Sequence, residues 1–506
     1  MKLRSLIIDI INILFIIPLY YLTRDNNIFL YTLSLYLYLI LSSMFNHIDI
    51  YSNIKYYYDN KYTYSLNTIY KYTNISIIII NIFISIIVGI VSLLFNNWFN
   101  IEGLIIVNIV MSLTLFIKPI LRNVSNFVKV YNFKTLGDNL ENIYKILNLI
   151  LLIISSIICF KVLDISDYIS IIVLYGCSII SFILVYLLSY LLVLSNKIKK
   201  RQFKKKEERI DYKNEIKEIL SRNINKSIVN IIKYGYIYIS IIILYFILSN
   251  RYGYSYEKVS DVINNCYFYA IGIINIILLI INHIESDRID KIRENISKKK
   301  YELVNLDNYI IRLFKVLLMI IVVLSIISDA IWTIIFNNNN GYILFIFSNF
   351  GVFYIMYSIV IKISIDNISN RKLYVSLIIG LIIKLVLIVP LISSLYRMGY
   401  NLLYGDCLSS LIAYLVVIIL IIINIGKKYR VDFIKKFDKI LNIIYYNIIL
   451  CVTLLLFTLV IPVKVSSRLE GFKVVIIYLI ISLIYIFIRK KIDKNERINK
   501  KNREEN

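Results

Sequence analysis

Long apolar runs recur along the whole chain, and short polar stretches separate them. A bilayer core about 30 Å thick needs about 20 apolar helical residues per crossing, and the runs approach or exceed that length. They lack the apolar–polar alternation of a membrane β-barrel, so the pattern predicts an all-α polytopic membrane protein. The fourteen predicted spans cover residues 5–22, 27–45, 75–95, 101–121, 145–163, 168–195, 228–249, 263–283, 309–336, 342–366, 372–393, 407–426, 439–461 and 472–489.

The composition supports this assignment and excludes an ordinary soluble enzyme. Apolar residue types make up 59% of the 506 residues and charged types 18%, whereas soluble proteins average about 45–50% and about 25%. Because so little polar surface cannot cover so much apolar surface in water, the excess must face lipid. The same hydrophobicity excludes a disordered chain.

The charges are mostly basic, and their positions define a topology. The 57 lysines and arginines outnumber the 32 acidic residues, which gives a net charge of +25. With the N-terminus in the cytoplasm, 43 of the 57 fall in cytoplasmic stretches and 7 in outer ones, as the positive-inside rule requires. We therefore expect a multi-pass protein of the cytoplasmic membrane with both termini inside. Contact with anionic inner-leaflet lipids accounts for the charge, and no compact basic domain indicates a nucleic-acid partner.

The longest basic stretch divides the spans into two groups, which is typical of transporters. We expect an N-terminal six-helix lobe, a basic amphipathic cytoplasmic linker, a C-terminal six-helix lobe, two additional helices and a basic tail. In that order these segments cover residues 1–195, 196–227, 228–426, 427–489 and 490–506. A faint repeat relates the halves, because span 2 ends in NHID, with His47, and span 8 in NHIE, with His283. We expect a monomer.

Motifs for catalysis, nucleotide hydrolysis or metal binding are absent from the sequence. It has no Gly-x-x-x-x-Gly-Lys-Ser/Thr loop and no Gly-x-Ser-x-Gly elbow. Its two histidines and five dispersed cysteines give no zinc-site spacing. We therefore expect no enzyme activity, no cofactor and no metal. The alternative is a membrane polymerase or ligase of lipid-linked saccharides, which would use residues on the predicted outer loops 250–262 and 394–406. Its candidates are Glu257, Asp261, Arg397 and Asp406.

Ionisable groups inside spans are costly and are therefore candidates for function. Lys384 lies twelve residues into span 372–393, about 18 Å from the inner edge. It is expected to face a wet cavity, an anionic ligand or a partner carboxylate, for which Asp329 is one possibility. The other cationic cavity candidates lie nearer the inner face, where their long side chains could instead reach the headgroups. They are Lys118, Lys233, Arg312, Lys315 and Lys362. Asp329, His47 and His283 are candidates for coupling or gating.

Several segments of the second half resemble the bacterial polysaccharide flippase family. This family includes lipid II, sporulation-type and O-antigen flippases of the multidrug/oligosaccharidyl-lipid/polysaccharide exporter superfamily. The likeness rests on 364–372 (SIDNISNRK), 379–384 (IGLIIK), Pro390, 404–407 (YGDC), 413–414 (AY) and 426–431 (GKKYRV). In addition, 135–144 (TLGDNLENIY) looks like the family's turn into span 5, and 215–249 like its linker into span 7.

The resemblance implies a flippase that moves a polyprenyl-pyrophosphate-linked saccharide by alternating access around a central cavity. Lipid II flippases typically carry arginines in spans 1, 2 and 8. Here span 1 has Asp9 as its ionisable residue, spans 2 and 8 have no basic residue, and Lys233 is the nearest substitute. The saccharide is therefore left open. A cation-coupled drug antiporter of the same superfamily is the second alternative, although it would favour carboxylates over lysines within the spans.

Overall fold

The predicted spans are helices in the structure. The computed structural model describes residues 2–22, 25–45, 63–99, 101–130, 134–165, 168–195, 224–297, 306–338, 340–364, 370–429 and 437–504. Regular structure in these ranges is entirely helical. Thirteen helices are long and apolar enough to cross a membrane, and Ile28–Ser42 is a slightly shorter apolar helix. Together they coincide with the fourteen predicted spans, and the all-α polytopic fold is confirmed.

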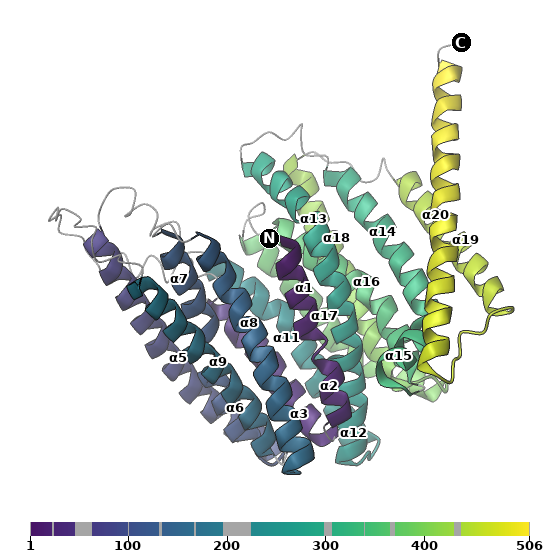
Figure 1. The fold of residues 1–506 in the computed structure, drawn as a ribbon. Helices are drawn as coiled ribbons and strands as arrows, with labels where there is room; N and C mark the ends of the chain where they lie inside the picture. The colour runs from purple at the N-terminus through teal and green to yellow at the C-terminus, as the bar shows by residue number, and fades with distance from the viewer. Residues whose placement is uncertain are drawn as a thin grey trace. The chain divides into compact units, whose positions relative to one another are not determined.

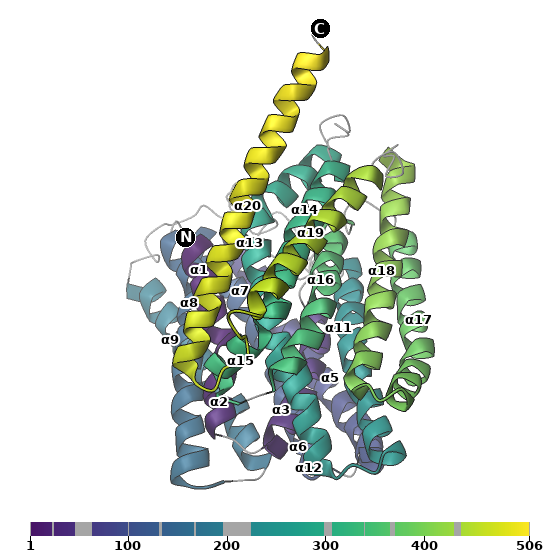
Figure 2. The same cartoon turned by 90° about the vertical axis from the view of Figure 1, so that its right-hand side faces the viewer.

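The helices form two compact units, Met1–His283 and Ile284–Asn506 (Figures 1 and 2). Unit 1 contains α1 (Lys2–Ile13), α2 (Ile16–Leu22), α3 (Asp25–Ser42), η1 (Ser43–Phe45), α5 (Thr63–Phe99), α6 (Leu104–Leu113), α7 (Ile117–Val130), α8 (Lys134–Ile157), η2 (Ile158–Val162), α9 (Tyr168–Ser195), α11 (Ile224–Phe246), η4 (Ile247–Arg251), α12 (Tyr256–Ile263), η5 (Asn264–Ala270) and the first half of α13 (Ile271–Ser297). Unit 2 contains the rest of α13, α14 (Leu306–Ile326), α15 (Ser328–Phe336), α16 (Gly341–Ser364), α17 (Asn370–Arg397), α18 (Leu402–Tyr429), α19 (Phe437–Thr458) and α20 (Arg468–Glu504).

In unit 1, α3 packs against helices from both parts of the sequence. It contacts α6 and α9 on one side of the linker, and α11 and α12 on the other. Thr32 Oγ1 donates to Asn264 Oδ1 at 3.2 Å, and Tyr36 OH donates to the Tyr267 carbonyl at 2.8 Å. These contacts explain why the compact unit extends to His283. The division into lobes 1–195 and 228–426 stays a prediction, and most of the predicted linker, residues 196–223, lies outside the described residues.

Several predicted boundaries differ from the structure, for local reasons. The first span is interrupted at residues 14–15 between α1 and α2, as Figure 1 shows. Span 309–336 is interrupted at Ile327, whose φ of −92° and ψ of 12° lie outside helical geometry. The predicted outer loop 250–262 contains α12, and α20 continues into the predicted basic tail.

The predicted outer loop 394–406 was also too long. Asn401 caps α18, since its Oδ1 accepts a hydrogen bond from the Leu403 amide at 3.0 Å. Asp406 therefore lies inside α18 and is only 1% exposed. The sequence pattern places Asp406 on an outer loop, and this prediction is wrong. The helix begins about one turn before the apolar run that was used to predict the span.

In unit 2, α16 is the central helix. About 83% of its most apolar 18-residue stretch is buried, the largest share for any candidate span in the described chain. It packs against α14, α15 and α18, while α18 also packs along α17 (Figure 2). Gly405 permits the close approach of α17 and α18, because a Cβ there would lie 2.5 Å from the backbone N and Cα of Ile392.

This geometry predicts that Gly405→Ala lowers the thermal unfolding temperature of the purified protein. The new methyl group would push two helix backbones apart, and overpacking of this kind costs about 1–3 kcal/mol. Gly176→Ala is the matched control, because a Cβ at Gly176 in α9 has no other atom within 4 Å. That control should be neutral or slightly stabilising. Equal shifts for the two variants would contradict the close contact at Gly405.

Candidate functional site

Lys384 lies on the face of α17 that packs against α18. The same stripe carries Leu377, Gly380, Ile388 and Ile392, all buried at helical spacing. The opposite face of α17 is exposed, with Ile382 and Val386 among its apolar side chains, and is suited to lipid. Lys384 itself is 2% exposed. A helix interface, rather than lipid or open space, therefore surrounds this lysine within unit 2.

Three α18 residues face Lys384 from one side of that helix. Asp406, Cys407 and Ser410 are separated by one, three and four positions and are all buried. The Lys384 ammonium donates a hydrogen bond to Ser410 Oγ at 2.6 Å, and it interacts electrostatically with the Asp406 carboxylate. We call these four residues the Lys384 cluster. A buried charge is tolerated when a counter-charge and hydrogen bonds accompany it, and the cluster supplies both.

Asp329, which the sequence suggests as a partner of Lys384, has other neighbours in the structure. It lies in the first turn of α15 and interacts electrostatically with Lys464. The carboxylate near Lys384 is instead Asp406, which the sequence analysis had assigned to a loop. Asn401 is the feature of the sequence that could have predicted this neighbour. Asparagine is a favoured N-cap residue, and a helix that begins after Asn401 includes Asp406.

The other cationic candidates lie on four helices, two in each unit. Lys118 on α7 is exposed, and Lys233 on α11 is half-buried, with its ammonium 5.7 Å from the centroid of the Tyr234 ring. In unit 2, Arg312 on α14 is exposed, while Lys315 on α14 and Lys362 on α16 are half-buried. Their convergence on one cavity stays a prediction.

Of the two histidines, His283 lies within the described residues. His47 lies outside the described residues. His283 is half-buried in α13, and its role in coupling or gating stays a prediction.

Unit 1 contains an ion pair that the sequence analysis missed. Lys145 Nζ on α8 lies 2.6 Å from Asp9 Oδ1 on α1, and each side chain is about one-third exposed. Lys118 interacts electrostatically with both members of this pair, and also with Arg122 and Glu141. The span predicted over residues 145–163 begins at Lys145, whereas α8 begins at Lys134 and places Lys145 in the interior of the helix. The sequence does indicate such a pair, because an acid within a predicted span, here Asp9, is costly unless a basic residue accompanies it.

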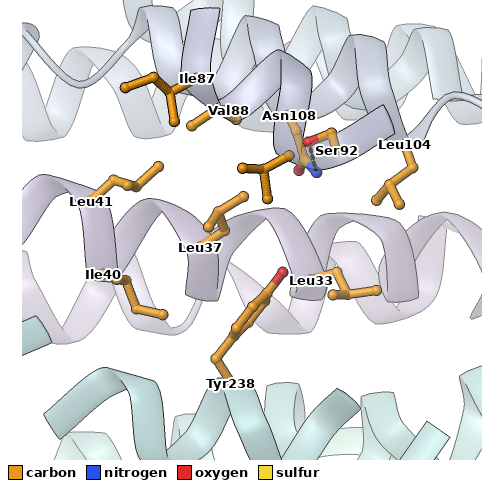
Figure 3. Close-up of a pocket in the computed structure, with 11 residues that line it drawn as sticks. Leu33, Leu37, Ile40, Leu41, Ile87, Val88, Ser92, Leu104, Asn108 and Tyr238 are labelled. Carbon is orange, nitrogen blue, oxygen red and sulfur yellow. Dashed lines mark hydrogen bonds between the residues drawn. The ribbon is translucent and has the colours of Figure 1, made fainter. Parts of the chain in front are cut away.

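Two cavities accompany these groups. A cavity of about 310 Å³ in unit 1 is lined mainly by leucine, isoleucine and valine side chains of α3, α5 and α6. Figure 3 shows its polar residues, with Asn108 donating to Ser92 Oγ at 3.0 Å and the Tyr238 hydroxyl reaching in from α11. A second cavity of about 350 Å³ in unit 2 is lined by the polar residues Asp329, Thr333, Lys464 and Ser466, together with Val465.

Comparisons with known proteins identify the fold. No protein-family model matches the chain, and no curated protein sequence matches it. Among solved structures, it is similar to a lipid II flippase MurJ in an inward closed conformation, with 13% identity and a TM-score of 0.62 over 96% of this chain and 98% of that one. It is also similar to an inward-facing multidrug resistance MATE family transporter of the MOP superfamily, with 13% identity and a TM-score of 0.56 over 84% of this chain and 96% of that one.

These likenesses agree with the family suggested by the sequence motifs. The chain is a multi-pass membrane protein with the fold seen in a lipid II flippase and in a MATE transporter. At 13% identity they establish the fold and leave the cargo open.

The Lys384 cluster predicts a specific stability pattern. Lys384→Met should lower the unfolding temperature strongly, because it leaves the Asp406 carboxylate buried without its positive partner. An unsatisfied buried polar group costs about 1–3 kcal/mol, and a charged one costs more. The double variant Lys384→Met/Asp406→Asn removes both charges and should recover much of the loss. Arg312→Gln, at an exposed side chain of the same unit, is the control and should change little. A full-sized loss in the double variant would show that Asp406 is not the partner.

Proposed function

We propose that the protein is a non-enzymatic flippase that moves a polyprenyl-pyrophosphate-linked saccharide across the cytoplasmic membrane by alternating access. The observation that carries this proposal is the likeness to a lipid II flippase over nearly the full length of both chains, 96% and 98%. The motifs of the second half point independently to the same family. In this proposal the saccharide headgroup crosses, while the polyprenyl tail stays in the bilayer.

The basic residues within the spans suit such a cargo. A pyrophosphate is highly charged and cannot cross hydrocarbon without compensation, and arginine and lysine supply it through charge-assisted hydrogen bonds. Arg312, Lys315, Lys362, Lys233 and Lys118 are exposed or half-buried, so their side chains can reach a ligand. We assign cargo contacts to these five.

Lys384 has a different place in the proposal. Its side chain is almost fully buried and already donates to Ser410. We therefore assign it a positioning role, in which the Lys384 cluster holds α17 and α18 together as one moving element. Anionic lipids of the inner leaflet are the expected neighbours of the basic helix ends, and the protein is expected to act as a monomer.

Two alternatives make different demands on the same residues. A drug antiporter is supported by the likeness to a MATE transporter, and the buried carboxylate of Asp406 would suit cation coupling. A polymerase or ligase would need acids exposed on outer loops. Asp406 is buried in α18, which leaves Glu257 and Asp261, both on α12, as its acidic candidates.

Reconstitution in liposomes tests the proposal. The substrate is an undecaprenyl-pyrophosphate disaccharide with a fluorophore on the sugar, and dithionite reports how much remains in the outer leaflet. Wild type should equilibrate the two leaflets. Arg312→Gln/Lys315→Gln should slow transfer at least tenfold, because each lost hydrogen bond to a charged group is worth about 1.5–3 kcal/mol.

The matched control removes the same charge from exposed helix ends of unit 2. Arg371→Gln/Lys439→Gln should transfer the substrate at the wild-type rate, since both side chains are exposed and outside the predicted set. Absence of transfer by wild type for several headgroups would reject the flippase. Efflux of a cationic dye driven by a proton or sodium gradient would then favour the antiporter.

A further inference from the structure

The second cavity, in unit 2, lies between a helix and a connection that are distant in sequence. One wall is α15, with Asp329 in its first turn and Thr333 one turn later. The other wall is the segment between α19 and α20, which contributes Lys464, Val465 and Ser466. Thr333 is buried, Asp329 is half-buried, and Lys464 and Ser466 are exposed. The cavity therefore has a closed floor and an accessible rim.

Close backbone contacts hold both walls in place. Gly341, the first residue of α16, lies so near Asp329 that a Cβ there would overlap its carboxylate. Gly471 in the first turn of α20 lies against α15, because a Cβ there would be 2.8 Å from Ile334 Cγ1 and 3.1 Å from the Ala330 carbonyl oxygen. The cavity volume of about 350 Å³ lies at the lower end of the roughly 300–1,000 Å³ of small-molecule sites.

The hydrogen-bonding pattern makes this cavity rich in acceptors. Thr333 Oγ1 donates its proton to the Asn338 carbonyl at 3.3 Å. Ser466 Oγ donates to Glu470 Oε2 at 2.9 Å, and the Ser466 amide donates to the same oxygen at 3.0 Å. With both hydroxyl protons committed, the hydroxyl oxygens keep lone pairs for a ligand. Asp329 adds a carboxylate acceptor, and Lys464 adds an ammonium donor.

We propose that this cavity binds a sugar ring through neighbouring hydroxyl groups. Sugar hydroxyls can donate to Asp329, Thr333 and Ser466, while one of their oxygens accepts from Lys464. A bound cation is disfavoured, because Lys464 opposes it and the described residues contain no group of three or more acidic, histidine or cysteine ligands. A simple anion is disfavoured by Asp329.

The inference rests on the proposed function, because it assigns the saccharide part of the cargo to a second site. In the topology expected from the basic residues, this end of unit 2 faces outward. The cavity would therefore hold the sugar on the outer side of the membrane, apart from the cationic side chains assigned to the pyrophosphate. Recognition of the sugar would then be separable from recognition of the charged linkage.

Saturation-transfer NMR on the full-length protein in phosphatidylethanolamine/phosphatidylglycerol nanodiscs tests this site directly. The probes are free glucose, galactose and N-acetylglucosamine, which carry no lipid or phosphate. At least one sugar should give a saturable signal with wild type. Asp329→Asn should weaken its binding at least tenfold. Val465→Trp, which fills the cavity and leaves its charges in place, should abolish binding. Arg371→Gln, at an exposed residue of α17, should bind as wild type does.

The outcomes separate this inference from the proposed function. Absence of sugar binding by wild type, or equal binding by all variants, overturns the inference, and flipping in liposomes would still support the flippase. Sugar binding that is lost in Asp329→Asn and Val465→Trp supports the site, even if no lipid-linked substrate is flipped. Unchanged unfolding temperatures of the two variants would confirm that lost binding is not lost folding. A sodium titration that displaces the sugar from wild type would instead identify a cation site and overturn the inference.

Discussion

The need to satisfy every backbone hydrogen bond inside hydrocarbon governs this structure. Water is absent there, so a peptide group that leaves a helix has no partner. The side chains obey the same constraint, because many buried hydroxyls donate to a carbonyl of their own helix three or four residues earlier. Examples are Ser156 to Leu152, Ser240 to Tyr236 and Ser482 to Tyr478. These residues can therefore be placed in the interior without a partner on another helix, and the polar contacts that do join helices stand out as specific.

Aromatic packing takes the place that small residues hold in many membrane proteins. The chain has 14 glycines and 44 tyrosines, so close backbone contact is confined to a few positions such as Gly405 and Gly341. In the core of unit 2, Tyr414 on α18 packs on Tyr357 of α16, with ring centroids 4.5 Å apart, and also on Phe350 at 5.4 Å. Such rings bury large areas with few rotatable bonds. They provide a broad, stiff surface between α16 and the α17–α18 pair, which suits an element that moves as one body.

Hydropathy predicted the spans well because lipid imposes one length on all of them. It could not predict the breaks at residues 14–15 and Ile327, because these depend on backbone geometry within an apolar run. Lys384 was singled out by its depth, but its neighbours lie on α18 and its hydrogen-bond partner is 26 residues away. A serine in a chain rich in serine carries no such signal. Lys145 was missed because the first turns of α8 are polar, and their sequence looks like a loop.

The ion pair between Asp9 and Lys145 has a consequence for how the protein is made. Its two members are 136 residues apart, so α1 leaves the ribosome long before α8 exists. At roughly 5–20 residues per second, Asp9 waits about 7–27 s for its partner. During that interval an acid within the first span resists insertion, by up to about 3 kcal/mol if it were at the bilayer centre. Until α8 is made, α1 therefore carries a carboxylate without its basic partner, and its insertion is less stable than in the folded protein.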